Sequence, residues 1–170
     1  IRYKISLNLL AQIHYSASLN MSGREAVFLL LLAGLAWMMG RKKPMVLCAY
    51  SIFLILYITL LRRAPGYNEQ IHLHLRFWPE AGVWAGNLLN LFLYIPFGWS
   101  FVQWKRKSGV WQILLTGFVL SVFCEALQYV TGRGWADVND VIFNVLGMGC
   151  GAWIYSKRAC HRTGSGTFKY

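Results

Sequence analysis

Two carboxylates that stand inside apolar stretches could act together as a general acid and a general base. Glu125 has Ser121 four residues before it and Gln128 three residues after it, so the three side chains share one face of a helix. Asp140 and Asn144 share a face in the next apolar stretch in the same way. A protonated carboxyl beside an ionised one can transfer a proton to a substrate, relay protons or bind a ligand. The residue types leave these three kinds of chemistry open.

The elements that carry these residues are long apolar segments. The chain has 170 residues, of which 56% are hydrophobic, and its mean hydropathy of +0.41 exceeds that of an ordinary soluble domain. The uncharged run from Pro44 to Leu61 is roughly 27 Å long as a helix, close to the ~30 Å thickness of the hydrocarbon core. Similar segments occupy residues 26–40, 82–104, 109–130 and 138–156. The sequence therefore predicts an all-α fold, a polytopic membrane helical bundle with about five transmembrane helices.

The distribution of lysine and arginine predicts how the bundle is oriented. If the loops at 41–43 and 105–107 and the segment after Ser156 are cytoplasmic, that side carries ten basic residues and the other side seven. The positive-inside rule then places the C-terminus in the cytoplasm. We expect an N-terminal segment at 1–23 that lies at the membrane interface, a transmembrane domain at 24–156 whose motifs fall within 82–156, and a cytoplasmic tail at 157–170.

This topology places the polar faces of the third, fourth and fifth segments at the same depth in the membrane. The third segment runs inward and carries Asn90 near its outer end. The fourth ends outside just beyond Glu125, and the fifth begins outside just before Asp140. Because the loop between the fourth and fifth segments is short, these two are antiparallel neighbours. We therefore expect one polar, ligand-binding pocket in the outer half of the bilayer, formed by Asn90, Glu125, Gln128, Arg133, Asp140 and Asn144.

Other residues near this pocket have the spacing of structural positions. Asp137 stands where a helix N-cap is expected, and acidic residues favour that end of a helix. Pro96 removes one backbone hydrogen bond within its helix, and Gly98 eases the resulting bend. Gly147 and Gly151 form a small-xxx-small face that suits close helix packing.

The charge of Glu125 needs compensation, since an ionised carboxylate within a span costs at least ~2.5 kcal/mol. Arg133, in the loop after the fourth segment, is the candidate partner. Such an ion pair can be purely structural, and it can also be part of a functional site. Both interpretations stay open at the level of the sequence.

Other kinds of site find little support. The net charge of +11 would suit nucleic acid, but the basic residues occur in clumps between apolar runs, so we expect no nucleic-acid binding. His72 and His74 form an HxH pair, in a stretch whose period-two alternation favours an extended segment on the membrane surface. Since Zn²⁺ needs three or four ligands, we expect no metal site. No dinucleotide or phosphate-loop motif indicates a cofactor, so none is expected.

Read in order, these residues resemble the VanZ-like family of bacterial membrane proteins. Three motifs carry the resemblance: NLFLYIPFG from Asn90, ExxQ from Glu125, and RxxxDxxDVIxN from Arg133. It covers about residues 85–155. The resemblance implies an all-helical, multi-pass protein of the bacterial cytoplasmic (inner) membrane, in a family whose founding member lowers susceptibility to teicoplanin.

Three classes of function fit these residues. The first is a protein that binds or handles an amphiphilic envelope ligand at the outer leaflet, either a lipid-linked precursor or a lipoglycopeptide antibiotic, and so contributes to teicoplanin resistance. The second is a membrane-embedded hydrolase or transferase that acts on a lipid-linked anionic substrate through Glu125 and Asp140, with Arg133 holding the head group. The third is a structural or partner-binding subunit. We favour the first, because Ser121 has no histidine within helical reach to activate it. Membrane lipids are expected partners in every case.

Overall fold

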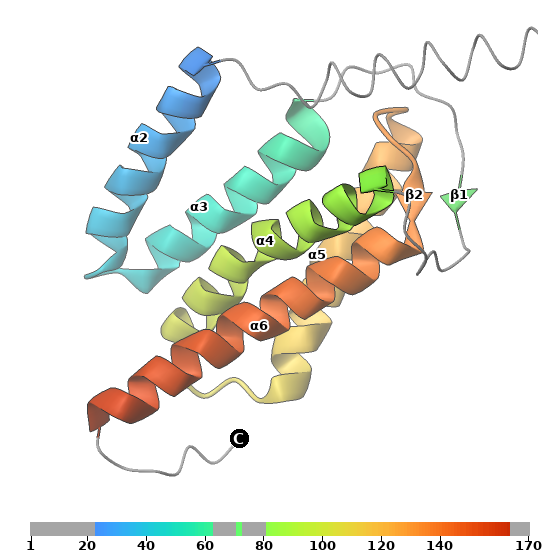
Figure 1. The fold of residues 1–170 in the computed structure, drawn as a ribbon. Helices are drawn as coiled ribbons and strands as arrows, with labels where there is room; N and C mark the ends of the chain where they lie inside the picture. The colour runs from blue at the N-terminus through green and yellow to red at the C-terminus, as the bar shows by residue number, and fades with distance from the viewer. Residues whose placement is uncertain (1–22, 63–70, 73–80, 164–170) are drawn as a thin grey trace, which may run out of the picture.

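The computed structural model describes residues 23–62, 71–72 and 81–163. Through these residues run the helices α2 (Gly23–Gly40), α3 (Pro44–Leu56), α4 (Ala81–Trp104), α5 (Val110–Val130) and α6 (Val138–Thr163) (Figure 1). A π-helical turn, η1 (Tyr57–Leu61), continues α3, and two short strands, β1 (Ile71–His72) and β2 (Ala136–Asp137), pair in parallel. The predicted all-α helical bundle is confirmed.

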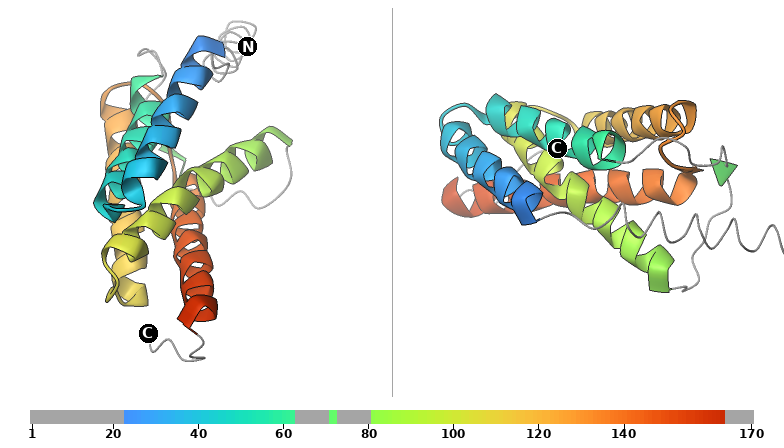
Figure 2. Two further views of the ribbon diagram at one scale, coloured as in Figure 1. Left: turned by 90° about the vertical axis from the view of Figure 1, so that its left-hand side faces the viewer. Right: turned by 90° about the horizontal axis from the view of Figure 1, so that it is seen from above.

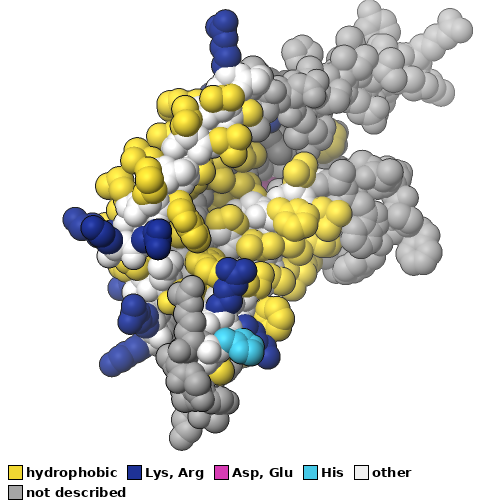
Figure 3. All heavy atoms as spheres, turned by 60° about the vertical axis from the view of Figure 1, so that its left-hand side comes forward, with side chains coloured by type: hydrophobic (Ala, Val, Ile, Leu, Met, Phe, Trp, Pro, Cys, Tyr) yellow, Lys and Arg dark blue, Asp and Glu magenta, His cyan; other side chains and the backbone are white. Residues whose placement is uncertain are grey.

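Three of the helical segments are long and apolar enough to cross a membrane: α2, α3 together with η1, and α5. Large apolar side chains lie exposed on them, among them Leu30 at 71%, Leu31 at 69% and Trp111 at 83%. Apolar surface of this extent marks a face that contacts lipid. Figure 3 shows one such face, on which hydrophobic side chains cover the helices and lysine and arginine gather toward one end. The chain is therefore a membrane protein.

The other two helices, α4 and α6, make the most extensive helix–helix contact in the described part of the chain, and they cross each other in Figure 2. Gly147 and Gly151 of α6 lie against the carbonyl oxygens of Leu91 and Ile95, where a Cβ atom would overlap those oxygens. Gly98 of α4 lies against α6 in the same way. The two helices run in the same direction, because the residue numbers increase together along the contact: Gly147 meets Leu91, and Gly151 meets Ile95. These glycines let the two backbones touch.

The core of the bundle lies where four helices meet. Its most deeply buried apolar members are Cys48 and Ile55 of α3, Tyr94 and Phe97 of α4, Cys124 of α5, and Met148 of α6. Each of the four helices contributes at least one large or close-fitting side chain, so none of them can leave without opening a cavity. This shared core fixes the relative positions of the polar residues on α4, α5 and α6.

A charged contact joins the start of α2 to the end of α3. The Tyr57 hydroxyl donates a hydrogen bond to Glu25 Oε1 over 2.5 Å, and Arg62 Nε lies 3.4 Å from the same oxygen. Glu25 is in the first turn of α2, where a carboxylate also stabilises the positive end of the helix. The first span expected from the sequence, residues 26–40, thus extends back to Gly23 through a residue whose charge is paired.

Two expected boundaries need comment. α6 continues to Thr163, so the first seven residues of the segment expected to form a tail, 157–163, are helical. Residues 1–22 of the expected interfacial segment lie outside the described residues, and so does His74. His72 lies in β1, in agreement with the extended conformation that its alternating pattern predicts.

Candidate functional site

Glu125 is buried near the end of α5, with 7% of its surface exposed. Its Oε2 accepts a hydrogen bond from the backbone N–H of Asp137 over 3.0 Å. A hydrogen bond to an ionised acceptor is stronger than one between neutral groups, so this contact offsets part of the cost of burying the carboxylate. Glu125 therefore ties the end of α5 to β2, the strand that leads directly into α6.

Asp137 stands at the start of α6. Its Oδ1 accepts a hydrogen bond from the backbone N–H of Asn139 over 2.9 Å, which is the geometry of an N-cap residue. Asp137 also pairs with His72 in the two-stranded parallel sheet. The connection between α3 and α4 thus meets the connection between α5 and α6 beside Glu125.

The end of α3 is capped by side chains that come from elsewhere in the chain. Gln128 Nε2 donates to the carbonyl oxygen of Thr59 over 2.9 Å. Arg133 Nη1 donates to the carbonyl oxygens of Leu60 and Leu61, over 2.8 and 3.4 Å. Helices leave their last carbonyls without intrahelical donors, and η1 presents three of them to these two side chains. Part of the hydrogen-bonding capacity of Gln128 and Arg133, both expected to line a ligand pocket, is therefore used to hold α3.

Polar side chains of α4, α5 and α6 meet in the interior. Asn144 Nδ2 donates to Ser121 Oγ over 2.8 Å, and both residues are buried, at 3% and 0% exposed. The Tyr94 hydroxyl lies beside Ser121 and Cys124 without a well-formed hydrogen bond to either. Two acceptors on this face, Asn144 Oδ1 and Gln128 Oε1, are buried and have no donor among the described residues. With the Tyr94 hydroxyl, the interior thus holds both acceptors and a possible donor that have no hydrogen-bond partner among the described residues.

Asn90 and Asp140 complete the expected set, and both are partly buried. Asp140 lies in the first turn of α6, one turn before Asn144. Asn90 lies one turn before Tyr94 on α4, and it forms none of the hydrogen bonds described above. Pro96 is on an exposed face of α4, which continues through it as a helix. The hydrogen bonds thus join one face of α5, formed by Ser121, Glu125 and Gln128, to η1, β2 and α6. Asn90 takes part in none of these bonds.

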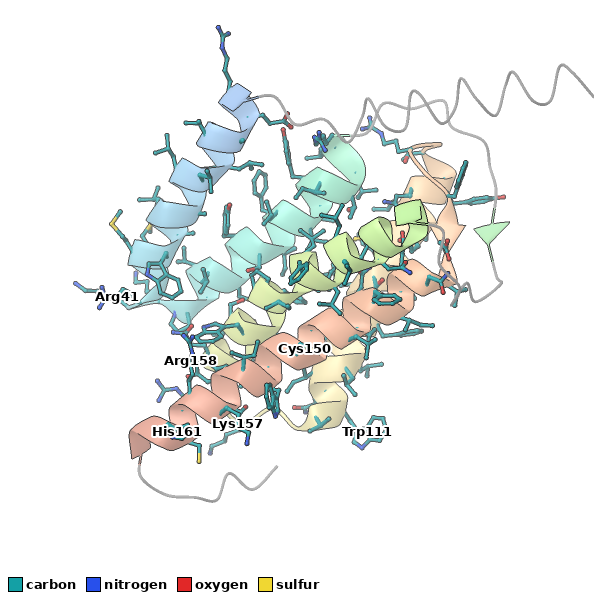
Figure 4. All side chains as sticks on the ribbon, viewed as in Figure 1. Arg41, Trp111, Cys150, Lys157, Arg158 and His161 are labelled. Atoms are coloured by element: carbon teal, nitrogen blue, oxygen red, sulfur yellow. The ribbon has the colours of Figure 1, made fainter. Side chains whose placement is uncertain are left out.

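The described residues of this interior offer polar groups for binding a ligand. Among the described side chains, histidine occurs at His161, near the far end of α6 (Figure 4). No described imidazole is therefore placed to activate Ser121 as a nucleophile. Within the same ranges, no three His, Cys, Asp or Glu side chains come together as metal ligands. What the residues do offer is a carboxylate and several amide groups held at fixed positions.

The role of η1 was not expected from the sequence. The available signal was Thr59, a polar residue near the end of an apolar run, which is 6% exposed and donates its own hydroxyl to the Ile55 carbonyl. Nothing in the local sequence shows that the carbonyls of residues 59–61 accept hydrogen bonds from residues about seventy positions later.

Comparison with known proteins assigns the family. A search of curated proteins and a search of solved structures find no match to the chain. A family model described as VanZ/LLP1 matches residues 26–160, which include all five helices in whole or in part and every residue of the polar interior. The resemblance carried by the motifs that begin at Asn90, Glu125 and Arg133 is confirmed, and the chain belongs to the VanZ/LLP1 family of membrane proteins.

Proposed function

We propose that this protein binds an amphiphilic ligand of the bacterial cell envelope at the outer-leaflet end of the bundle. The ligand would be a lipid-linked envelope precursor or a lipid-tailed glycopeptide such as teicoplanin, and binding the latter would lower susceptibility to it. The residues proposed to contact the polar head group are Asn90, Glu125, Gln128, Arg133, Asp140 and Asn144.

The observation that carries this proposal is a group of buried polar atoms that have no hydrogen-bond partner among the described residues. Asn144 Oδ1 and Gln128 Oε1 lie in the interior without a donor from the described residues. Gln128 is on the same face of α5 as Glu125, and Asn144 of α6 contacts that face through its hydrogen bond to Ser121. A buried acceptor without a partner costs about 1–3 kcal/mol. Sugar hydroxyls and peptide amides, which envelope precursors and glycopeptides carry in number, are donors that would remove this cost. Lipid tails of the same ligands would lie along the exposed apolar faces of the helices.

The proposed orientation follows from the charges at the two ends of the bundle. Basic side chains at 41–43 and 105–107 and on the last turns of α6 lie at one end, toward which Figure 3 shows lysine and arginine gathered. This end is proposed to face the cytoplasm, together with the C-terminus. Glu125 and Asp137 lie toward the opposite end, where α5 ends and α6 begins. In the bacterial cytoplasmic membrane, that end faces the outer leaflet.

Ligand binding is tested with protein purified in detergent, by native mass spectrometry with a lipid-linked peptidoglycan precursor. We expect Asn144→Ala and Glu125→Gln to weaken binding by about tenfold or more, since each alters a group proposed to contact the head group. Glu125→Gln keeps an oxygen that can accept from the Asp137 N–H, so it separates binding from folding. Gln112→Ala, at the opposite end of α5, is the matched control and should bind like the wild type.

The same experiment separates a binder from an enzyme. Equal binding by the wild type and both interior variants, each measured on monodisperse protein, would remove this site from the proposal. Conversion of the precursor by the wild type, with conversion lost and binding kept in Glu125→Gln, would instead assign the acid–base role to Glu125 and Asp140. If the residues act as one unit, the double variant Glu125→Gln with Asp140→Asn should bind no more weakly than the weaker single variant.

Orientation is tested separately by cysteine labelling of intact cells with a membrane-impermeant thiol reagent. Thr131→Cys, on the exposed connection between α5 and α6, should be labelled from outside, and Lys107→Cys should be labelled only after lysis. Gly132 is a poorer position, because its φ of 60° lies in the left-handed region, where a cysteine would be strained. The reverse labelling pattern would place the polar interior in the inner leaflet.

A further inference from the structure

A cavity lies at the opposite end of the bundle from Glu125. It has a volume of about 740 Å³ and opens between the α2–α3 loop and the last turns of α4 and α6. Its walls include Trp37, Arg41, Trp99, Arg106, Tyr155 and Arg158. Figure 4 shows Arg41 and Arg158 at the same corner of the molecule, although they come from opposite ends of the sequence. Cavities of this size commonly hold a small molecule or a head group.

The basic side chains that line the cavity are all arginines, although this end of the bundle carries both arginine and lysine. Arg41, Arg106 and Arg158 line it, whereas the five lysines of the same end do not: Lys42, Lys43, Lys105, Lys107 and Lys157. A topology signal needs positive charge alone, and either residue would supply it. Arginine differs because its planar guanidinium binds phosphate through two parallel hydrogen bonds. The concentration of arginine in the cavity therefore points to a phosphate ligand.

Among the described residues, no acidic side chain lies in the loops or helix ends that line this cavity. The six acidic residues of the chain are at positions 25, 69, 80, 125, 137 and 140, all of them outside the loops at 41–43 and 105–109 and before the last turns of α6. Three positive charges thus border one cavity with no carboxylate of the neighbouring loops to pair with. An anion placed among them would relieve their mutual repulsion.

Aromatic rings hold one of these guanidinium groups in place. Arg158 lies over the ring of Trp99, 5.0 Å from its centroid, and Trp99 packs edge-on against Tyr155 with 5.6 Å between centroids. A stacked guanidinium loses less freedom when it binds an anion than a mobile one does. The remaining wall contains the apolar side chains of Leu47 and Val102 and one amide side chain, Gln103. Charge and apolar surface therefore meet in one cavity, as the head group and chains of a lipid do.

We propose that this cavity binds the phosphodiester head group of an anionic phospholipid, with the acyl chains along the apolar wall. The ligand chemistry follows from the cavity itself, and only its assignment to the inner leaflet depends on the orientation proposed above. Clusters of arginine at a cytoplasmic membrane surface are attracted to anionic lipid, with about 1 kcal/mol, or a fivefold change in affinity, for each base near the surface. The site is separate from the polar interior around Glu125.

The test uses the full chain purified in detergent and native mass spectrometry with three probes: phosphatidylglycerol, phosphatidylcholine and inorganic phosphate. We expect phosphatidylglycerol to bind in preference to the other two. Replacing Arg41, Arg106 and Arg158 together by Gln should weaken its binding on the order of a hundredfold. The matched control replaces Lys42, Lys107 and Lys157 by Gln, which removes the same charge from the same segments. It should bind within about threefold of the wild type, because these exposed lysines do not line the cavity and solvent screens their charge.

Several results would overturn the proposal. Equal losses in the arginine and lysine triple variants would show attraction to charge without a site, and equal affinities for the two phospholipids would exclude head-group recognition. Saturation of the arginines by inorganic phosphate at the same concentration would assign the site to a free anion. If the triple variant is not monodisperse, the single changes Arg41→Gln and Arg106→Gln, both at exposed positions, are compared with Lys42→Gln and Lys107→Gln. Glu125→Gln should leave phosphatidylglycerol binding unchanged, so this test is independent of the outer-leaflet proposal.

Discussion

The two ends of the bundle treat charge in opposite ways. Toward the end where α5 stops and α6 starts, Glu125 is buried and is matched to the backbone N–H of Asp137. At the other end the bases lie exposed, and several rest on aromatic rings, as Lys105 does over Trp104 at 4.6 Å. At the first end a charged side chain is buried within the helix packing, and at the second the charged side chains are exposed on the surface.

Helix α5 makes the contrast within one element. Gln112 in its first turn is exposed, and its Oε1 accepts from the N–H of Gly109 over 3.2 Å. Gln128 near its last turn is 1% exposed and donates to the Thr59 carbonyl of another helix. A glutamine side chain thus caps its own helix at one end of α5, and a second glutamine links two helices at the other end. Burial makes the second bond costly to lose, since water cannot replace the missing partner.

The largest expected effect comes from breaking the α4–α6 contact that supports both ends. Gly151→Ala puts a Cβ onto the Ile95 carbonyl, so we expect a loss of stability of roughly 3 kcal/mol or more and little monodisperse protein. Gly149→Ala is the matched control, because its Cβ would lie 3.5 Å from Leu114 Cδ2, an ordinary contact. It should stabilise α6 by up to about 1 kcal/mol, as alanine does in a helix. Thermal unfolding in detergent measures both, and similar losses in the two variants would contradict the contact.

The next largest effect separates the two glutamines of α5. Gln128→Met keeps the volume of the side chain but leaves the buried Thr59 carbonyl without its donor, so we expect a loss of about 1–3 kcal/mol. Gln112→Met removes only an exposed bond and should cost about 0.5 kcal/mol or less. The measurement is the detergent unfolding temperature of both variants. Equal shifts would mean that burial does not distinguish the two ends.

A smaller effect is expected at the N-cap of α6. Asp137→Ala removes the acceptor of the Asn139 N–H and should cost about 1 kcal/mol. Asp137→Asn keeps a side-chain oxygen at the cap and should recover most of that loss. Both variants retain the backbone N–H that binds Glu125, so the comparison isolates the cap. Equal unfolding temperatures for the Ala and Asn variants would assign Asp137 a role other than capping.

The smallest effect on stability is expected at the exposed basic residues. Lys107→Ala, in the exposed loop between α4 and α5, should change stability by no more than about 0.5 kcal/mol. Its unfolding temperature should match that of the wild type within error. A loss as large as that of Asp137→Ala would show that the basic end also depends on its charges for folding.

Local sequence determined the helices and the nature of their polar faces. The uncharged run Pro44–Leu61 coincides with α3 and η1, and the other spans match their helices within a few residues except at the C-terminal end of α6. The faces formed by Ser121, Glu125 and Gln128 follow from the helical period, which depends on neighbours along the chain. The position of Asp137 before α6 follows from the chemistry of helix N-termini. The family resemblance was readable for the same reason, since its motifs are short and contiguous.

Tertiary structure alone decided which partners those faces meet. Gln128 and Arg133 cap the carbonyls of η1, across about seventy residues of chain, because η1 packs against α5 and so brings those carbonyls into reach. Three arginines from the α2–α3 loop, the α4–α5 loop and α6 line one cavity for a similar reason. Helical period and hydropathy depend on neighbouring residues, whereas a hydrogen-bond partner or a cavity wall depends on how whole helices pack, which no single segment of sequence specifies.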